Sequence, residues 1–133
     1  MGIPAYFSHI IKNHSELLNK KTNNIDHLLL DSNSIIYDNI DNDDNIIIKN
    51  VCKKLEYYIK FIKPTKSVYI AFDGIAPLAK LKQQRERRYK NCFIKSLLKQ
   101  SGWNTASITP GTTFMNKLSR EIMNYFKHNN NIN

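Results

Sequence analysis

Two aspartates stand at the ends of the strongest strand patterns in this sequence. Residues 27–31 (HLLLD) and 67–72 (SVYIAF) are short apolar runs typical of buried parallel strands. Asp31 ends the first run and Asp73 follows the second. Ligands bind beyond the carboxyl ends of parallel strands, where paired carboxylates can hold a hard divalent cation, Mg²⁺ or Mn²⁺. The alternative is that each carboxylate merely caps the next turn or helix.

A basic helix is predicted directly after Asp73, from Pro77 to about Ser101. At about 100° per residue, one side of this helix carries polar and basic residues, namely Lys80, Gln84, Arg87 and Arg88. The opposite side is mainly apolar and comprises Leu78, Leu81, Tyr89, Cys92, Phe93 and Leu97. Arginine forks fit phosphate oxygens bidentately, whereas lysine acts as a point charge. The pattern therefore predicts a phosphate-binding face.

The net charge of +9 is unevenly distributed along the 133 residues. Lysines and acids cancel in residues 1–73, so the whole excess lies in residues 74–133. This asymmetry favours a polyanionic partner, nucleic acid first and an anionic membrane surface second. A solvated basic face without a partner is the competing interpretation.

Both cysteines lie in apolar stripes without metal-like spacing. We interpret Cys52 and Cys92 as reduced core residues of an intracellular protein, cytoplasmic rather than nuclear. The longest apolar runs are only a few residues, so we expect neither a signal peptide nor a membrane span, and no membrane partner.

The remaining elements alternate between the two strands. We predict a short helix after Pro4, a helix over about 46–63 that Pro64 stops, and a final helix from Thr109-Pro110-Gly111 to about residue 127. Residues 105–108 fit a short third strand, and residues 128–133 a disordered tail. The fold class is α/β, a parallel sheet with flanking helices in one domain over residues 1–127.

Four segments together carry a family resemblance. They are MGIPAYF at the start, LLLDSNSII at 28–36, YIAFDGIAPLAKLKQQRERRY at 69–89 and ITPGTTFM at 108–115. In order and spacing the chain resembles the amino-terminal part of the Xrn/Rat-type 5′-3′ exoribonucleases, which are similar to the wider PIN and flap-endonuclease group. The resemblance covers residues 1–116 and implies a partial nuclease domain.

The resemblance also assigns roles to the residues singled out above. Asp31 and Asp73 would be catalytic metal ligands for Mg²⁺ or Mn²⁺, and the chemistry would be two-metal hydrolysis of the phosphodiester. The pocket for the substrate's 5′-monophosphate would consist of Lys80, Gln84, Arg87 and Arg88. RNA with a 5′-monophosphate is the implied substrate, with single-stranded DNA as a further partner.

Several positions depart from the family pattern. Tyr37 replaces a histidine that usually contacts the scissile end, and Thr113 stands where an acid is usual. The acidic segments that complete the family's metal site are also absent, since no aspartate follows Asp73 and Glu121 is the only acid beyond Glu86. A second chain or segment would have to complete that site.

Three interpretations follow. The chain is the amino-terminal part of a 5′-3′ exoribonuclease, with doubtful activity by itself. Alternatively, it is a non-catalytic nucleic-acid-binding module that retains the 5′-phosphate pocket. In the third interpretation, the basic helix docks on a membrane or a protein.

Overall fold

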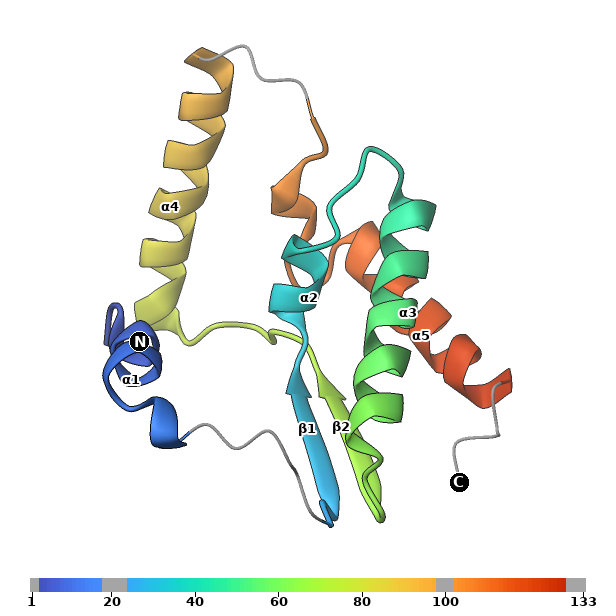
Figure 1. Cartoon of the computed structure of the whole chain (residues 1–133). Helices are drawn as coiled ribbons and strands as arrows, with labels where there is room; N and C mark the ends of the chain where they lie inside the picture. Colours follow the sequence, from blue (N-terminus) through green and yellow to red (C-terminus); the bar gives the residue numbers. More distant parts are fainter. Residues whose placement is uncertain (1–2, 18–23, 98–101, 129–133) are drawn as a thin grey trace.

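The two predicted strands form the centre of the fold. The computed structural model describes residues 3–17, 24–97 and 102–128 (Figure 1). Strands β1 (His27–Asp31) and β2 (Ser67–Ala71) pair in parallel, with His27 opposite Ser67 and Asp31 opposite Ala71. Because the strands are parallel, the chain must cross over between them, and it does so through two helices. The predicted α/β class, a parallel sheet with flanking helices, is confirmed.

Three helices and one face of the sheet build the core. They are α2 (Asn33–Tyr37), α3 (Asp44–Ile62) and α5 (Thr113–His128). In α3, Ile47, Val51 and Leu55 repeat every four residues and are fully buried. They pack with Ile36 of α2 and Leu118 of α5 in one cluster. We call this packed unit of α2, α3, α5 and the sheet the body, and several of its large side chains are completely removed from water.

Local capping fixes where α3 begins and ends. The Asp43 carboxylate accepts a hydrogen bond from the Asn45 backbone N–H at 2.7 Å, which satisfies a donor of the first turn. At the other end, Lys63 takes a left-handed conformation immediately before Pro64. The predicted helix over about 46–63 is confirmed, two residues longer at its start and one shorter at its end.

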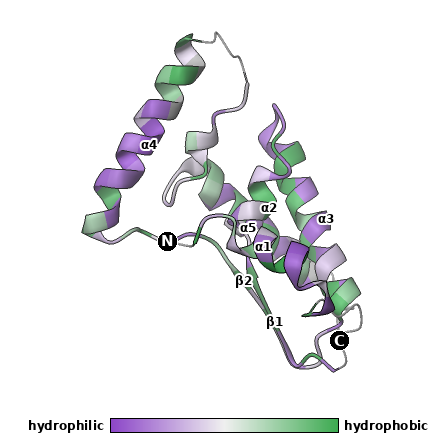
Figure 2. Ribbon diagram, turned by 60° about the vertical axis from the view of Figure 1, so that its left-hand side comes forward, coloured by the Kyte–Doolittle hydropathy of each residue, from purple (hydrophilic) through white to green (hydrophobic). Residues whose placement is uncertain are grey.

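The helix α4 (Leu78–Leu97) differs from the core helices because it extends away from the sheet (Figures 1 and 2). Its apolar side is exposed, with 86% of Leu78 and 64% of Phe93 accessible to solvent. The prediction that Cys92 is a core residue is therefore wrong, because α4 extends away from the core helices and leaves Cys92 exposed. Cys52, on α3, is buried as predicted.

The first helix, α1 (Tyr6–Asn13), also lacks a packed face. It is followed by the short 3₁₀ helix η1 (Ser15–Leu17) and buries none of its residues. Two separate amphipathic helices thus keep apolar surface outside the core.

The predicted third strand over residues 105–108 is wrong. Residues Thr105–Ser107 form a 3₁₀ helix, η2. Asn104 caps it by accepting the Ala106 N–H at 3.0 Å, and the Thr109 hydroxyl donates to the Ala106 carbonyl at 2.7 Å. These local bonds satisfy the backbone groups that a strand would have needed a neighbour to satisfy.

The chain after η2 turns before the last helix begins. Gly111 has a φ of 85°, a left-handed value that favours glycine, so α5 begins at Thr113 and not at Thr109. His128 is the last residue of α5, and the rest of the predicted tail, 129–133, lies outside the described residues, as does the predicted end of the basic helix at 98–101. Across the described ranges, no helix combines the length and apolarity needed to span a membrane.

Candidate functional site

The carboxyl ends of β1 and β2 bring the two predicted aspartates to one edge of the sheet. Asp31 ends β1 directly opposite Ala71, and Asp73 follows two residues after Ala71. Alternate residues of an extended chain share a face, so both carboxylates are placed on the side of Ala71. Both residues are exposed to solvent.

That side of the sheet has no cover among the described residues. Leu29 is 73% exposed and Tyr69 is 63% exposed, although both are large apolar residues in the middle of their strands. Parallel sheets normally have helices on both faces. The aspartates therefore adjoin an open apolar face.

Hydrogen bonds hold the two strand ends together. The Ser32 N–H donates to the Ala71 carbonyl at 2.8 Å, which extends the pairing one residue beyond β1. The Asp73 N–H donates to the side-chain oxygen of Asn33 at 3.1 Å. Asn33 is the first residue of α2, so this helix fixes the backbone of Asp73.

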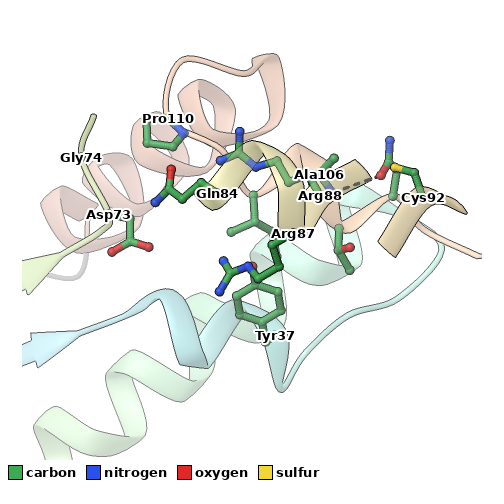
Figure 3. A pocket seen from close by; sticks show the side chains of 12 residues that line it. Tyr37, Asp73, Gly74, Gln84, Arg87, Arg88, Cys92, Ala106 and Pro110 are labelled. Carbon is green, nitrogen blue, oxygen red and sulfur yellow. Dashed lines mark hydrogen bonds between the residues drawn. The ribbon is translucent and has the colours of Figure 1, made fainter. Parts of the chain in front are cut away.

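Two adjoining cavities lie between these strand ends and α4, and we call them together the α4 hollow. One, of about 350 Å³, lies against α2 and η2; the other, of about 330 Å³, lies along the start of α4. They share Asp73, Gln84 and Arg87. Figure 3 shows Gln84 and Arg87 reaching from α4 toward Asp73 and Tyr37. Arg88 lines the larger cavity and Lys80 the smaller.

The helical repeat explains why these four side chains converge. Gln84 follows Lys80 by four residues, and Arg87 and Arg88 follow Gln84 by three and four, so all of them project from one side of α4. Gln84 and Arg88 are partly buried, whereas Lys80 and Arg87 are exposed. Among the described residues, none of these basic groups forms an ion pair with a carboxylate. Their donors can bind an anion in the hollow.

The wall opposite α4 consists of residues that the sequence patterns did not single out as one site. It contains Tyr37, Ile108, Pro110 and the η2 turn, Asn104 to Ala106, while Cys92 of α4 also faces the hollow. Trp103 anchors this wall to the body, since its ring packs edge-on against Phe114 at 4.8 Å and its Nε1–H donates to Asp44 at 2.6 Å. Tyr37 and the Thr109-Pro110-Gly111 motif were the signals for this wall in the sequence.

The metal site implied by the resemblance is only partly represented. Asp31 and Asp73 are hard oxygen donors, so their chemistry fits Mg²⁺ or Mn²⁺. Asp31 lines neither cavity of the α4 hollow. No group of three or more histidine, cysteine, aspartate or glutamate side chains is positioned to hold a metal within the described part of the chain. The donor type fits, but two carboxylates fall short of the six or so oxygens that such ions take.

The fold and the candidate site together describe an α/β protein with an anion-binding site at the edge of its sheet. A parallel α/β sheet carries carboxylates at its carboxyl edge, beside a hollow whose cationic side chains can bind an anion. The profile described as "XRN 5′-3′ exonuclease N-terminus" matches residues 1–133. The chain belongs to this family.

Named relatives agree with this assignment. The chain is 33% identical to 5′-3′ exoribonuclease 1 of Saccharomyces cerevisiae and 34% identical to that of Schizosaccharomyces pombe, over 96% of its own length in both cases. Identity to the human 5′-3′ exoribonuclease 1 is 32% over 95% of the chain. The aligned region is only 10%, 11% and 9% of these three relatives, respectively. The chain thus spans about a tenth of their length.

Proposed function

We propose that this chain forms the part of a 5′-3′ exoribonuclease that receives the 5′-monophosphate end of an RNA. The observation that carries the proposal is that Lys80, Gln84 and Arg87 line one hollow with Asp73, at the carboxyl edge of the sheet. A terminal phosphate offers oxygens on several sides, which one ammonium, one amide and one or two guanidinium groups can bind together. A 5′-hydroxyl end lacks this group.

The proposal gives Asp31 and Asp73 the role of ligands for a divalent cation, Mg²⁺ or Mn²⁺. When bound, such an ion would stabilise charge on phosphodiester oxygens and activate water. The contribution of this chain is to hold the phosphate end beside the two carboxylates, so that the first phosphodiester bond lies near them. Asn33 supports this arrangement through its bond to the Asp73 backbone.

We further propose that a second chain or segment completes the metal site. The described residues supply only two suitable carboxylates at the sheet edge, and the sheet face beside them is uncovered. A polypeptide that packs on Leu29 and Tyr69 would place its own side chains next to Asp31 and Asp73. Without it, the chain by itself is the non-catalytic module that binds 5′-phosphorylated ends, which is the second candidate function.

Binding measurements with paired RNA ends test the first part of the proposal. By fluorescence anisotropy, the chain should bind 5′-monophosphate RNA more tightly than the same RNA with a 5′-hydroxyl. Arg87→Ala should reduce this preference about ten-fold or more, because a hydrogen bond to a charged group contributes about 1.5–3 kcal/mol. Lys82→Ala is the matched control: it removes a charge from α4 at a residue that lines neither cavity. Equal affinity for both RNA ends in the unmodified chain would refute the proposal.

Two further measurements separate the enzyme from the binding module. Asp31→Ala and Asp73→Ala should each lower the affinity for Mn²⁺, measured by calorimetry, without unfolding the domain. If the chain degrades 5′-monophosphate RNA with Mg²⁺, both substitutions should abolish the cleavage; persistence of cleavage in both variants would identify a contaminating nuclease. Binding without cleavage would support the module.

Competition with single-stranded DNA addresses the choice of polymer. If the hollow recognises the phosphate and not the 2′-hydroxyl, DNA with a 5′-phosphate should compete as well as RNA of the same length. A strong preference for RNA would instead show that a hydroxyl is read near the hollow.

A further inference from the structure

A second basic and aromatic surface lies on the side of α3 that faces away from the core. We call it the α3 outer stripe, and its members follow one another at helical spacing: Asn50, Lys53, Lys54, Tyr57 and Phe61. With Asn39, the first four of these residues line a shallow groove of about 350 Å³. The stripe contributes nothing to the packed core, because 55% of Tyr57 and 66% of Phe61 are accessible to solvent.

The aromatic rings of the stripe are already arranged as a platform. The rings of Tyr57 and Phe61 are stacked, with centroids 6.0 Å apart and planes within 12° of parallel. The Lys54 ammonium lies 5.3 Å from the centroid of the Tyr57 ring and 5.2 Å from that of Tyr58, which holds its charge beside the rings. A flat, exposed aromatic surface of this kind can stack on any nucleobase.

The stripe also keeps a positive charge available to solvent. Lys53 is exposed and forms no ion pair with a carboxylate of the described chain. Lys60, on a neighbouring position of the helix, is instead neutralised by Glu56 at 2.6 Å. Unpaired ammonium groups beside exposed rings and amides are typical of surfaces that bind single-stranded nucleic acid without reading its sequence.

Residues two positions apart at the end of α2 line the α4 hollow and the groove. Tyr37 lines the hollow and Asn39 lines the groove, so the two sites are separated along the chain only by Asp38. Helix α2 lies between α4 and α3 in Figure 1. A strand whose end is held at α4 can therefore continue over α2 to α3.

We propose that the α3 outer stripe binds the single-stranded RNA that follows the 5′ end, with bases on the Tyr57 and Phe61 rings and a phosphate at Lys53. This inference rests on the proposed function for the identity of the bound end. A protein partner fits the surface less well, because the two rings are interleaved with ammonium and amide groups and do not form a continuous apolar patch.

The test compares two lengths of 5′-monophosphate RNA, about three and about fifteen nucleotides, in anisotropy titrations of the full chain. The double variant Lys53→Ala with Tyr57→Ala should weaken binding of the longer RNA about ten-fold and leave the shorter RNA unaffected. Its salt slope for the longer RNA should fall by about 0.7, the loss of one contact with a single-stranded phosphate. Asp38→Asn should strengthen binding of the longer RNA, because it removes a negative charge between the α4 hollow and the groove on α3.

The control variant is Lys49→Ala, which also removes one positive charge from α3. Lys49 is exposed and lines a different groove, between α3 and α5. Equal losses for Lys49→Ala and the double variant would overturn the inference, since they would show a general charge effect. The inference would also be overturned if, in analytical ultracentrifugation, the unmodified chain proved to be a dimer and the double variant a monomer, since the stripe would then be a protein interface. If the unmodified chain shows no preference for a 5′-phosphate but the double variant still loses affinity for long RNA, the proposed function fails and the second surface stands.

Discussion

Helices α3 and α4 are both amphipathic, and the structure treats their apolar sides in opposite ways. α3 buries Val51 and Leu55 completely against α2 and α5. α4 leaves Leu78 and Phe93 largely in solvent. The α4 hollow lies where the packed body meets this extended helix, so one wall is fixed by the core and the other by a helix with few packing partners.

The weak packing of α4 affects how an anion would bind in the α4 hollow. Ordering α4 against the body costs conformational entropy, which a ligand that contacts both walls can offset. An anion bound by Arg87 on α4 and in contact with Tyr37 on the body touches both walls. We therefore expect the 5′-phosphate end to stabilise the α4 side of the hollow more than the core.

The largest expected difference is between the effects of a core substitution and an α4 substitution on the free energy of unfolding. Leu55→Ala should lower the free energy of unfolding by about 2–5 kcal/mol, because it leaves a cavity in a fully buried cluster. Phe93→Ala should change it by no more than about 0.5 kcal/mol, since the ring is mostly solvated. Urea denaturation followed by circular dichroism measures both. A large loss for Phe93→Ala would mean that α4 is packed in solution, and its dependence on protein concentration would reveal self-association.

The two cysteines should report the same contrast by their reactivity. Burial, aided by the negative charge of Glu121, raises the pKa of the Cys52 thiol to about 11, so very little of it is thiolate at neutral pH. Cys92 is exposed on α4. Ellman's reagent should therefore modify one thiol per folded chain quickly and the second more than about 100-fold more slowly. Cys92→Ser should remove the fast phase, and two fast thiols would show that the body opens easily.

Modification of Cys92 also tests whether RNA binds in the α4 hollow. Cys92 lines the larger cavity of the α4 hollow, so a bound 5′-monophosphate RNA should slow its modification. RNA with a 5′-hydroxyl should protect it less. Equal protection by both RNAs would place the phosphate away from Cys92.

Local patterns predicted most of the framework. The apolar runs before Asp31 and Asp73 and the repeat of α3 depend on neighbours in sequence, and all were found within a few residues of the expected bounds. The convergence of Lys80, Gln84, Arg87 and Asp73 also follows from local geometry, because a helical repeat begins just after a strand end. Their roles in binding remain predictions.

What local patterns could not predict depends on which surfaces find partners. Cys92 lies in an apolar stripe like Cys52, yet only Cys52 has helices packed over it. Residues 105–108 have strand-like composition, but Asn104 and Thr109 close local hydrogen bonds that favour a 3₁₀ turn. Because both outcomes depend on competition between local and distant contacts, periodicity alone could not decide them.

A substitution at the strand ends, where the body meets the start of the chain to α4, should have a smaller effect on stability and on RNA binding. Asn33→Ala removes the acceptor of the Asp73 N–H, and should reduce stability by about 0.5–1.5 kcal/mol and the preference for a 5′-phosphate several-fold. The control is Asn45→Ala, which breaks a 2.7 Å bond to Lys117 within the body. It should leave the phosphate preference unchanged. If both variants lose the preference equally, Asn33 does not act by positioning Asp73.

The smallest effect on stability is expected for a substitution at the opposite end of the sheet, far from α4. Hydrogen bonds from Lys66 and Thr65, each 2.6 Å long, lower the pKa of Asp26 below its ordinary value of 3.8. A lowered pKa means that the ionised carboxylate is favoured in the folded state, so its contribution is present above that ordinary value and is lost as the pH falls through the folded pKa. Asp26→Asn should therefore reduce stability slightly near neutral pH and flatten the dependence of stability on pH below about 4. Urea midpoints across that range measure the difference, and parallel pH profiles for the two proteins would show that this pair does not hold the strand ends together.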